Sequence, residues 1–298
     1  MKVLITGASG FLGGRLLDYA IAAWGRESVL AFGTVNNPKC ETIIYDLQCE
    51  GLALEDAQLA SLSDVELLIH AGAFTPKSGA QANDSVRCNQ NIFFTQQLLA
   101  LPFPALKKVI YTSTLDVYAA AAVISESSLT LPETLYGWSK LYCEKLVTIY
   151  ARERQLSRQI LRVGHVYGPG EEKYAKFLPK AIQAIVSGAP VELYGDGAEL
   201  RSFIYIDDVV KAIFAAVDLT EDVDVINVVG ANPIAIKDLL ACLVSISGID
   251  VQVQTRDFNG VKRDLVFDAS LMNEKLLPAE TDLLLGLRKE YEYFASMK

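Results

Sequence analysis

Tyr136 and Lys140 are the residues of this chain whose spacing most directly suggests chemistry. They lie four residues apart in Tyr136-Gly-Trp-Ser-Lys140, and no other Tyr of the sequence is followed by a Lys at this spacing. If a helix begins near Tyr136, the two side chains lie one turn apart on the same face. An ammonium beside a phenol stabilises the phenolate and lowers the tyrosine pKa from its usual value of about 10. Such a tyrosine can exchange a proton with a carbonyl oxygen during hydride transfer.

A cluster of hydroxyl groups precedes this pair. The apolar run 109–112 predicts a strand, and it opens into Ser113-Thr-Leu-Asp-Val-Tyr118. Because parallel sheets bind ligands at the carboxyl ends of their strands, we expect this segment to border a binding site.

The first fourteen residues predict a dinucleotide-binding turn. The unbroken apolar run 3–5 is typical of a strand buried on both faces, and Gly7, Gly10 and Gly13 follow at once. In such a turn the glycines permit the bend, admit a pyrophosphate and allow close helix packing, while the helix N-terminus offers N–H groups to phosphate. The alternative is that the glycines serve packing alone. The residues expected to contact the cofactor are Gly7, Ser9, Gly10, Phe11 and Leu12.

The ends of the next predicted strands concern the identity of the dinucleotide. The predicted strand 28–32 is followed by Gly33, Thr34 and Asn36, where NAD-binding folds carry an acidic residue for the ribose hydroxyls. This favours NADP(H) over NAD. A third predicted strand, 42–45, ends in Asp46 and Leu47, which are well placed for the adenine amino group.

Alternating strands and helices predict the fold class. A fourth predicted strand, 65–69, runs into His70-Ala-Gly-Ala73, and a predicted helix over 89–101 ends before Pro102. This spacing indicates an α/β fold with a doubly wound parallel (Rossmann) sheet. The small residues Ala71, Gly72 and Ala73 would let the backbone pass close to a cofactor, although a tight exit from the strand explains them equally well.

Composition excludes several classes of function. The net charge of -9 argues against a nucleic-acid surface, because phosphate backbones require clustered Lys and Arg. The first predicted strand begins at residue 2 and no apolar stretch is long enough to span a bilayer, so we expect a cytoplasmic protein without a membrane partner. The 5 scattered cysteines and 2 histidines indicate reduced core thiols and no metal site.

These segments together resemble the extended short-chain dehydrogenase/reductase family, specifically its nucleotide-sugar epimerase, dehydratase and 4-ketoreductase branch. The likeness is carried by Thr6-Gly-Ala-Ser-Gly-Phe-Leu-Gly13 (TGxxGFxG in the family), by Asp46-Leu47 at the adenine contact, and by His70-Ala-Gly-Ala73 (HxAA). It implies that Thr114 stands in the place of the catalytic Ser or Thr and that Tyr136 with Lys140 forms the YxxxK pair.

The second half of the chain extends the resemblance. Arg162-Val-Gly-His-Val-Tyr-Gly-Pro169 resembles RxxNVYGP, and Tyr194-Gly-Asp-Gly197 with the segment 201–209 resembles GDG and RDFxYVDDV. The resemblance implies that Arg201 pairs with a substrate diphosphate; the alternative is an arginine buried against Asp207 or Asp208. It also implies a late strand over 258–268 and a helix start at Ala269-Ser270. For the cofactor, it further implies contacts with Tyr136, Val163 and Lys140, of which Lys140 would anchor the nicotinamide ribose. For the substrate, the implied contacts are Thr75, Thr114, His165, Phe177, Tyr194 and Arg201.

The sequence departs from the family pattern at several positions. His165 replaces the usual Asn, which would change that contact or make it pH-sensitive. The family's RPGD is replaced by Gly260-Val-Lys-Arg-Asp264, which leaves Arg263 as the candidate for a second phosphate contact. Leu115 stands where the 4,6-dehydratases carry an acid, and this disfavours dehydration.

The activity that the resemblance implies is NAD(P)-dependent oxidoreduction at C4 of a nucleotide-linked hexose. Because the second strand end is not acidic, we expect a 4-ketoreductase using NADPH, acting on a substrate such as a dTDP-4-keto-6-deoxyhexose. The alternative is a 4-epimerase that retains NAD. A non-catalytic dinucleotide-sensing regulator would be expected to lose Tyr136 or Lys140, and a reductase of steroid or flavonoid ketones would leave Arg201 without a purpose.

The resemblance also implies an organisation in two parts. An NAD(P)-binding Rossmann domain would cover 1–166, with a strand and helix near 206–230 returning to it, and a smaller substrate-binding lobe would cover 167–298. Substrate specificity would lie in 74–83, 118–135 and 171–177. A homodimer through helices at 89–101 and 139–152 is implied, although a helix buried within the monomer explains the same apolar pattern. The apolar residues behind this expectation are Leu141, Tyr142, Leu146, Val147, Ile149 and Tyr150.

Overall fold

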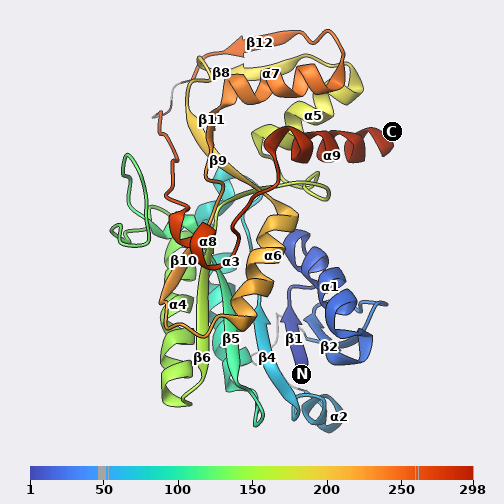
Figure 1. The fold of residues 1–298 in the computed structure, drawn as a ribbon, viewed down its shortest axis with the longest axis vertical. Helices are drawn as coiled ribbons and strands as arrows, with labels where there is room; N and C mark the ends of the chain where they lie inside the picture. Colours follow the sequence, from blue (N-terminus) through green and yellow to red (C-terminus); the bar gives the residue numbers. More distant parts are fainter. Residues whose placement is uncertain (46–51, 53, 259, 261, 298) are drawn as a thin grey trace. The chain divides into compact units, whose positions relative to one another are not determined.

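The computed structural model describes residues 1–45, 52, 54–258, 260 and 262–297. The chain forms two compact units (Figure 1). Unit 1 comprises Met1–Ala119, Leu129–Val163 and Val210–Ile226, and unit 2 comprises Ala120–Ser128, Gly164–Val209 and Asn227–Lys298. The polypeptide therefore passes between the two units several times.

The frame of unit 1 is a parallel sheet with the strand order β10-β6-β5-β4-β1-β2-β3. Val3, Leu4 and Ile5 of β1 are fully buried, as expected for an unbroken apolar run in a sheet covered on both faces. The strand order reverses at β1, between β2 and β4, which is the switch point where doubly wound sheets bind ligands. The predicted Rossmann fold is confirmed. The strand bounds are β1 Lys2–Thr6, β2 Val29–Gly33, β3 Glu41–Ile44, β4 Val65–His70, β5 Lys108–Thr114, β6 Ser157–Val163 and β10 Val225–Val228.

Helices cover both faces of this sheet (Figure 1). On one face, α3 (Ser85–Ala100) and α4 (Leu135–Glu153) lie side by side, and Phe94, Leu98 and Val147 of these helices join the core cluster of the strands. Trp24 of α1 (Phe11–Trp24) stacks on Phe214 of α6 (Ile206–Asp218) with 4.6 Å between ring centres. The shorter elements are η1 Arg26–Ser28, α2 Asp56–Ala60, η2 Gly79–Asn83 and η3 Leu115–Val117.

Unit 2 has a core of its own built from small sheets and helices. Its sheets have the strand orders β11-β9-β7 and β12-β8. Helices α5, α7 and α9 pack on one another through buried apolar residues such as Ile182, Leu243 and Leu287. The bounds are β7 His165–Tyr167, α5 Phe177–Ser187, β8 Val191–Tyr194, β9 Leu200–Tyr205, β11 Pro233–Ala235, α7 Ile236–Ser247, β12 Val253–Arg256, α8 Ser270–Lys275 and α9 Leu283–Ser296.

One helix start and one implied strand differ from the sequence expectations, and one helix start agrees with them. Helix α3 begins at Ser85, four residues before the predicted start, because the Asp84 side chain caps it by accepting a hydrogen bond from the Arg87 N–H. The strand implied over 258–268 is replaced, in the described part of that range, by isolated bridges at Leu265 and Phe267. The helix start at Ser270 is confirmed, since the Asp268 carboxylate accepts a hydrogen bond from its N–H at 2.9 Å.

The glycine turn after β1 is held by very close backbone packing. Gly7 has a φ of +74°, and a Cβ placed on it would lie 2.6 Å from the Cα of Gly72. A Cβ on Gly13 would lie 2.0 Å from the carbonyl oxygen of Gly7. Packing alone therefore requires glycine at both positions, independently of any bound phosphate.

We predict that Gly13→Ala lowers the free energy of unfolding by about 3 kcal/mol, because the new methyl group overlaps the Gly7 carbonyl and forces α1 away from β1. Gly14→Ala is the matched control: a Cβ at Gly14 lies 3.5 Å from the Ala8 oxygen, an ordinary contact. Alanine favours a helix over glycine, so this variant should gain about 0.5–1 kcal/mol. Urea unfolding of both variants measures the difference, and equal stabilities would contradict the packing argument.

Candidate active site

Lys140 is fixed by contacts with the end of β5. Its side chain is buried, its Nζ donates a hydrogen bond to the Thr112 carbonyl at 2.7 Å, and Nζ lies 4.3 Å from the centre of the Tyr111 ring. Burial lowers the pKa of Lys140 to about 8. The Thr134 side chain caps α4 by accepting a hydrogen bond from the Gly137 N–H at 3.1 Å, so the helix begins one residue before Tyr136. Tyr136 and Lys140 therefore lie one turn apart on α4, as predicted.

Thr114 is brought to the same place by the tight packing of η3 against α4. A Cβ on Gly137 would lie 2.3 Å from the Asp116 carbonyl oxygen, so the chain after Thr114 touches the first turn of α4. The Thr114 Oγ1 accepts a hydrogen bond from the Asp116 N–H at 3.2 Å, which leaves the hydroxyl hydrogen to be donated elsewhere. Val163 pairs directly with Thr114 across β5 and β6. Leu115 is buried, and Asp116 is exposed.

A buried ion pair that the sequence analysis missed holds α4 on the sheet. The Glu144 carboxylate accepts two hydrogen bonds from the Arg162 guanidinium, at 2.9 and 2.7 Å, and a third from the Ser113 hydroxyl at 2.5 Å. The Arg162 guanidinium also lies over the Tyr118 ring, 4.7 Å from its centre. The sequence feature that could have indicated this ion pair is the position of Glu144, which lies one turn beyond Lys140 on the same helix face. This pair joins β5, α4 and β6 directly behind the Tyr-Lys pair.

Two of the segments expected to bind the dinucleotide, the glycine turn and 71–73, lie together at the switch point. Gly10 is the N-cap of α1, and the first N–H groups of a helix have no acceptor within the helix. Ala71, Gly72 and Ala73 follow β4, and the Gly72 N–H donates to the Thr6 hydroxyl at 2.8 Å, which holds the ends of β1 and β4 together. This glycine cradle at a helix N-terminus fits a pyrophosphate. Ser9 is exposed, Phe11 and Leu12 form the first turn of α1, and Asp46 and Leu47 lie outside the described residues.

Basic side chains surround the segment that follows β2. The Lys39 Nζ pairs with the Asp18 carboxylate at 2.5 Å, and the Arg26 Nη2 donates to the Pro38 carbonyl at 3.2 Å. The sequence from Gly33 to Cys40 contains no acidic residue.

Unit 2 groups several of the predicted substrate residues. The Arg201 Nη1 donates to the carbonyls of Leu200 and Arg263, at 2.8 and 2.7 Å, so Arg263 lies beside it. Asp208, one of the alternative partners of Arg201, instead accepts hydrogen bonds from the Thr281 N–H and hydroxyl. Phe177 is the first residue of α5, and Thr75 is an exposed residue of unit 1. Tyr194 lies apart on β8, where its hydroxyl donates to Glu192 at 3.2 Å.

His165 on β7 is neutral at physiological pH. Burial, together with the positive charges of Arg201 and Lys176, lowers its pKa to about 4. The centre of its ring lies 6.0 Å from the ring centre of Phe203 and 6.4 Å from the ring centre of Phe267. A neutral imidazole offers one hydrogen-bond donor and one acceptor, fewer than an Asn side chain. Because its pKa is about 4, we expect no change of its charge between pH 6 and 9.

A buried carboxyl pair ties the predicted specificity segment 171–177 to helix α9. Glu171 and Glu290 are both buried, and the Lys176 Nζ lies 3.0 Å from Glu171 Oε1. Burial and the neighbouring Glu171 raise the pKa of Glu290 well above its usual range. At neutral pH the pair therefore retains a proton, and Lys176 balances the remaining negative charge.

We predict that Glu290→Gln stabilises the protein increasingly as pH rises. A glutamate whose pKa is higher in the folded state binds more protons there, so the wild-type protein loses stability from about pH 4.5 upward until the folded state also deprotonates. The variant removes this loss and should gain about 1–3 kcal/mol at pH 8. Thermal unfolding between pH 5 and 9 measures it. Glu292→Gln, an exposed position on the same helix, is the control; parallel curves for wild type and Glu290→Gln would contradict the prediction.

Neither a membrane-spanning helix nor a metal-ligand cluster occurs in the described part of the chain. No helix there combines the length and apolar character needed to cross a bilayer. No cluster of three or more His, Cys, Asp or Glu side chains within those residues has the arrangement of a metal site.

Comparison with known proteins gives consistent matches. A family model described as the NAD dependent epimerase/dehydratase family matches residues 3–229. The solved structure of UDP-glucuronic acid 4-epimerase from Bacillus cereus, in complex with UDP-glucuronic acid and NAD, is 26% identical, with 100% of both chains covered and a TM-score of 0.84. The resemblance to nucleotide-sugar enzymes of the extended short-chain dehydrogenase/reductase family is thus confirmed.

Curated relatives include enzymes with different reactions. The dTDP-D-glucose 4,6-dehydratase of Dictyostelium discoideum is 26% identical over 83% of this chain, which spans only 62% of that protein's length. The dTDP-4-dehydro-6-deoxy-D-allose reductase of a Streptomyces species is 25% identical, with 83% of this chain and 81% of the relative covered.

Proposed function

Because the chain belongs to the NAD-dependent epimerase/dehydratase family, we propose that it transfers a hydride between a nicotinamide dinucleotide and C4 of a nucleoside-diphosphate hexose. The observation that carries the proposal is the grouping of Thr114, Tyr136 and Lys140 at the carboxyl end of β5. Unit 1 would bind the dinucleotide through Gly7, Gly10, the first turn of α1 and the segment 71–73. The proposed domains remain a Rossmann domain over 1–166 and a substrate-binding lobe over 167–298.

Tyr136 would act as the acid/base on the C4 oxygen. The Lys140 ammonium, one turn from Tyr136 on α4, would stabilise the phenolate, so the tyrosine would release its proton when a ketone is reduced and recover it when an alcohol is oxidised. Thr114 would donate its hydroxyl hydrogen to the same oxygen, since its lone pair already accepts from the Asp116 N–H. The dinucleotide supplies the hydride donor or acceptor when it is bound.

The substrate diphosphate would bind to unit 2 through Arg201 and Arg263. Arg201 is partly buried and fixed by two backbone carbonyls, and a guanidinium binds phosphate oxygens in a bidentate manner. Arg201 and Lys176 both lower the pKa of His165, so their positive charges act on the same part of unit 2. This positive charge would favour a bound diphosphate. Within unit 2, the other proposed substrate contacts are His165, Phe177 and Tyr194. Within unit 1, the proposed substrate contact besides Thr114 is Thr75.

Two reactions use this machinery, and a separate observation favours each. The full-length similarity to the Bacillus cereus UDP-glucuronic acid 4-epimerase favours 4-epimerisation with a retained dinucleotide. The absence of an acid from 33–40 favours NADP(H) and hence the 4-ketoreductase expected from the sequence. Leu115 is buried next to Thr114, where a dehydratase requires an acid, so we do not propose dehydration. We place the 4-epimerase first and the ketoreductase second.

We predict that Tyr136→Phe lowers kcat by about 10²–10⁴-fold and leaves dinucleotide binding within threefold, because it removes the proton-transferring hydroxyl and keeps the ring and the Lys140 contact to the cofactor. Tyr150→Phe, on the same helix, is the control. Cofactor released from purified protein identifies NAD or NADP by mass, and NMR of UDP-glucuronic acid and UDP-glucose follows epimerisation. A 340 nm assay with dTDP-4-keto-6-deoxyglucose and NADPH or NADH detects reduction.

The outcomes separate the two reactions. Retained dinucleotide with epimer formation and no net oxidation identifies the 4-epimerase, whereas net NADPH consumption identifies the ketoreductase. A wild-type protein that binds neither dinucleotide contradicts the whole proposal.

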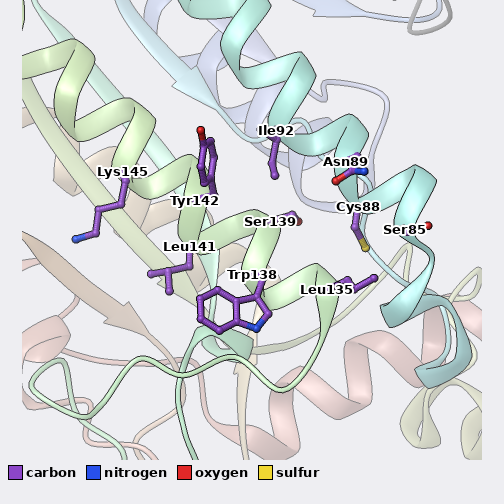
Figure 2. Close-up of a pocket in the computed structure, with 10 residues that line it drawn as sticks. All are labelled: Ser85, Cys88, Asn89, Ile92, Leu135, Trp138, Ser139, Leu141, Tyr142 and Lys145. Atoms are coloured by element: carbon purple, nitrogen blue, oxygen red, sulfur yellow. The ribbon is translucent and has the colours of Figure 1, made fainter.

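We also propose that the protein is a cytoplasmic homodimer. Cys40, Cys88, Cys143 and Cys242 are free thiols, as expected in a reducing compartment. Figure 2 shows an apolar groove between α3 and α4, with a volume of about 530 Å³, lined by side chains that include Ile92, Trp138 and Tyr142. Val147 and Tyr150 belong to the monomer core instead, so the exposed apolar surface is narrower than the sequence suggested. A second copy of α3 and α4 would cover the groove.

We predict that Tyr142→Arg shifts the protein from dimer to monomer without lowering its unfolding temperature by more than a few degrees. Tyr142 is 50% exposed, so the charge disrupts only a surface contact. The control is Leu284→Arg on α9, where a side chain of similar exposure, 49%, lies in unit 2. Light scattering on a size-exclusion column gives the mass; a monomeric wild-type protein would refute the interface.

A further inference from the structure

We infer that His70 is a positioning residue: a directional chain of hydrogen bonds through its imidazole aligns the strand end that carries the glycine turn with the first turn of α4, which carries Tyr136. The inference rests on the proposed function, because the aligned groups are the proposed cofactor cradle and the proposed acid/base.

The chain of hydrogen bonds begins at the end of β1. The Thr6 Oγ1 lies 2.8 Å from His70 Nδ1 and also accepts a hydrogen bond from the Gly72 N–H at 2.8 Å. Thr6 immediately precedes Gly7, and Gly72 lies against Gly7 in the tight backbone packing described above. A shift of the His70 ring would therefore move the cradle on both sides of the switch point.

The direction of each bond follows from the donors available. The Thr95 hydroxyl donates its one hydrogen to the Asn91 carbonyl at 2.8 Å. His70 Nε2, 3.0 Å from the Thr95 Oγ1, must then be the donor of that contact. In a neutral ring this leaves Nδ1 as an acceptor, so the Thr6 hydroxyl donates to it. Both ring nitrogens are thus used in fixed and opposite roles.

The chain continues from α3 to the acid/base. The Asn91 side-chain amide donates to the Phe74 carbonyl at 3.1 Å and to the Ser139 Oγ at 3.2 Å, while its oxygen accepts from the Phe74 N–H at 2.7 Å. The Ser139 hydroxyl then donates to the Tyr136 carbonyl at 2.8 Å. Asn91 and Ser139 are both buried, so no water competes for these bonds.

The surroundings keep the imidazole neutral, so the donor and acceptor roles persist. His70 is 1% exposed, and its ring contacts those of Phe94 and Tyr111, with 5.5 and 5.1 Å between ring centres. Burial and the positive charge of Lys140 lower the pKa of His70 to about 3. A second donor at Nδ1 would break the bond from Thr6 and is excluded over the physiological pH range.

Stability alone gains little from a satisfied buried network compared with apolar groups of the same shape. The network matters more for alignment, because hydrogen bonds with fixed directions restrain the end of β1 and helix α4 relative to each other. A misplacement of about 1 Å between reacting groups can reduce turnover by about 10²-fold.

The test compares Thr95→Val with Thr95→Ser. Valine keeps the shape of threonine but removes the acceptor for His70 Nε2, whereas serine keeps the hydroxyl. We expect Thr95→Val to lower kcat by about 10–100-fold with KM for the nucleotide sugar within about threefold, and Thr95→Ser to remain within about threefold of wild type in both. Leu98→Ala is the control for destabilisation, because Leu98 is fully buried one turn further along α3 and carries no polar group.

A second measurement does not depend on activity. Amide hydrogen exchange of the ligand-free protein reports the Gly72 and Phe74 N–H groups, which are bonded to Thr6 and Asn91. We expect both to exchange faster in Thr95→Val than in Thr95→Ser or Leu98→Ala. Equal exchange in the two Thr95 variants overturns the alignment itself, whether or not the protein is active.

The two results also separate the inference from the proposed function. If wild type is active and Thr95→Val has a wild-type kcat, the positioning role is wrong. If wild type turns over no nucleotide sugar but the exchange difference is present, the hydrogen-bonded alignment stands and the proposed reaction fails.

Discussion

The arrangement of unit 1 depends on a buried ammonium group. Lys140 is removed from water almost completely, and a charge in that position requires compensation. The Thr112 carbonyl and the Tyr111 ring provide it, and both belong to β5. The position of α4 is therefore restricted to the few placements that keep Nζ on that carbonyl. Because Tyr136, Gly137 and Ser139 belong to α4, the same constraint fixes their positions. It also fixes the contact of Gly137 with the Asp116 carbonyl.

A second buried charged group, Glu144, lies one turn beyond Lys140 on α4. The Glu144–Arg162 pair is almost fully buried and bidentate, and the Ser113 hydroxyl occupies a further lone pair of the carboxylate. Such a pair contributes little net stability over apolar residues, but removing one partner leaves an uncompensated buried charge. Together with Lys140 it gives α4 two polar attachments to the sheet, which specify its rotation as well as its distance. An apolar helix face alone would permit a wider range of both.

Local patterns in the sequence were sufficient for much of this structure. The unbroken apolar runs identified the strands of the central sheet, and the four-residue spacing of Tyr136 and Lys140 identified the helix face, because both signals arise within one element. Asn91 and Ser139 could not be found in this way, since they are 48 residues apart and their contact exists only after α3 and α4 pack. The strand implied over 258–268 was wrong for a similar reason: pairing there depends on partners at Ile124 and Arg201, far away in the sequence. Asp46 and Leu47 lie outside the described residues.

The backbone contacts of Arg201 affect the thermodynamics of ligand binding. The guanidinium already donates through Nη1 to two carbonyls, so its rotamer is selected when unit 2 folds and not when an anion arrives. A flexible arginine on a surface loses conformational entropy on binding, of the order of 0.5–1.5 kcal/mol for one immobilised side chain. In this protein the conformational entropy of the Arg201 side chain is lost when unit 2 folds. Anion binding at this arginine should consequently show a smaller unfavourable entropy than at a surface arginine, and its temperature dependence should be correspondingly weak.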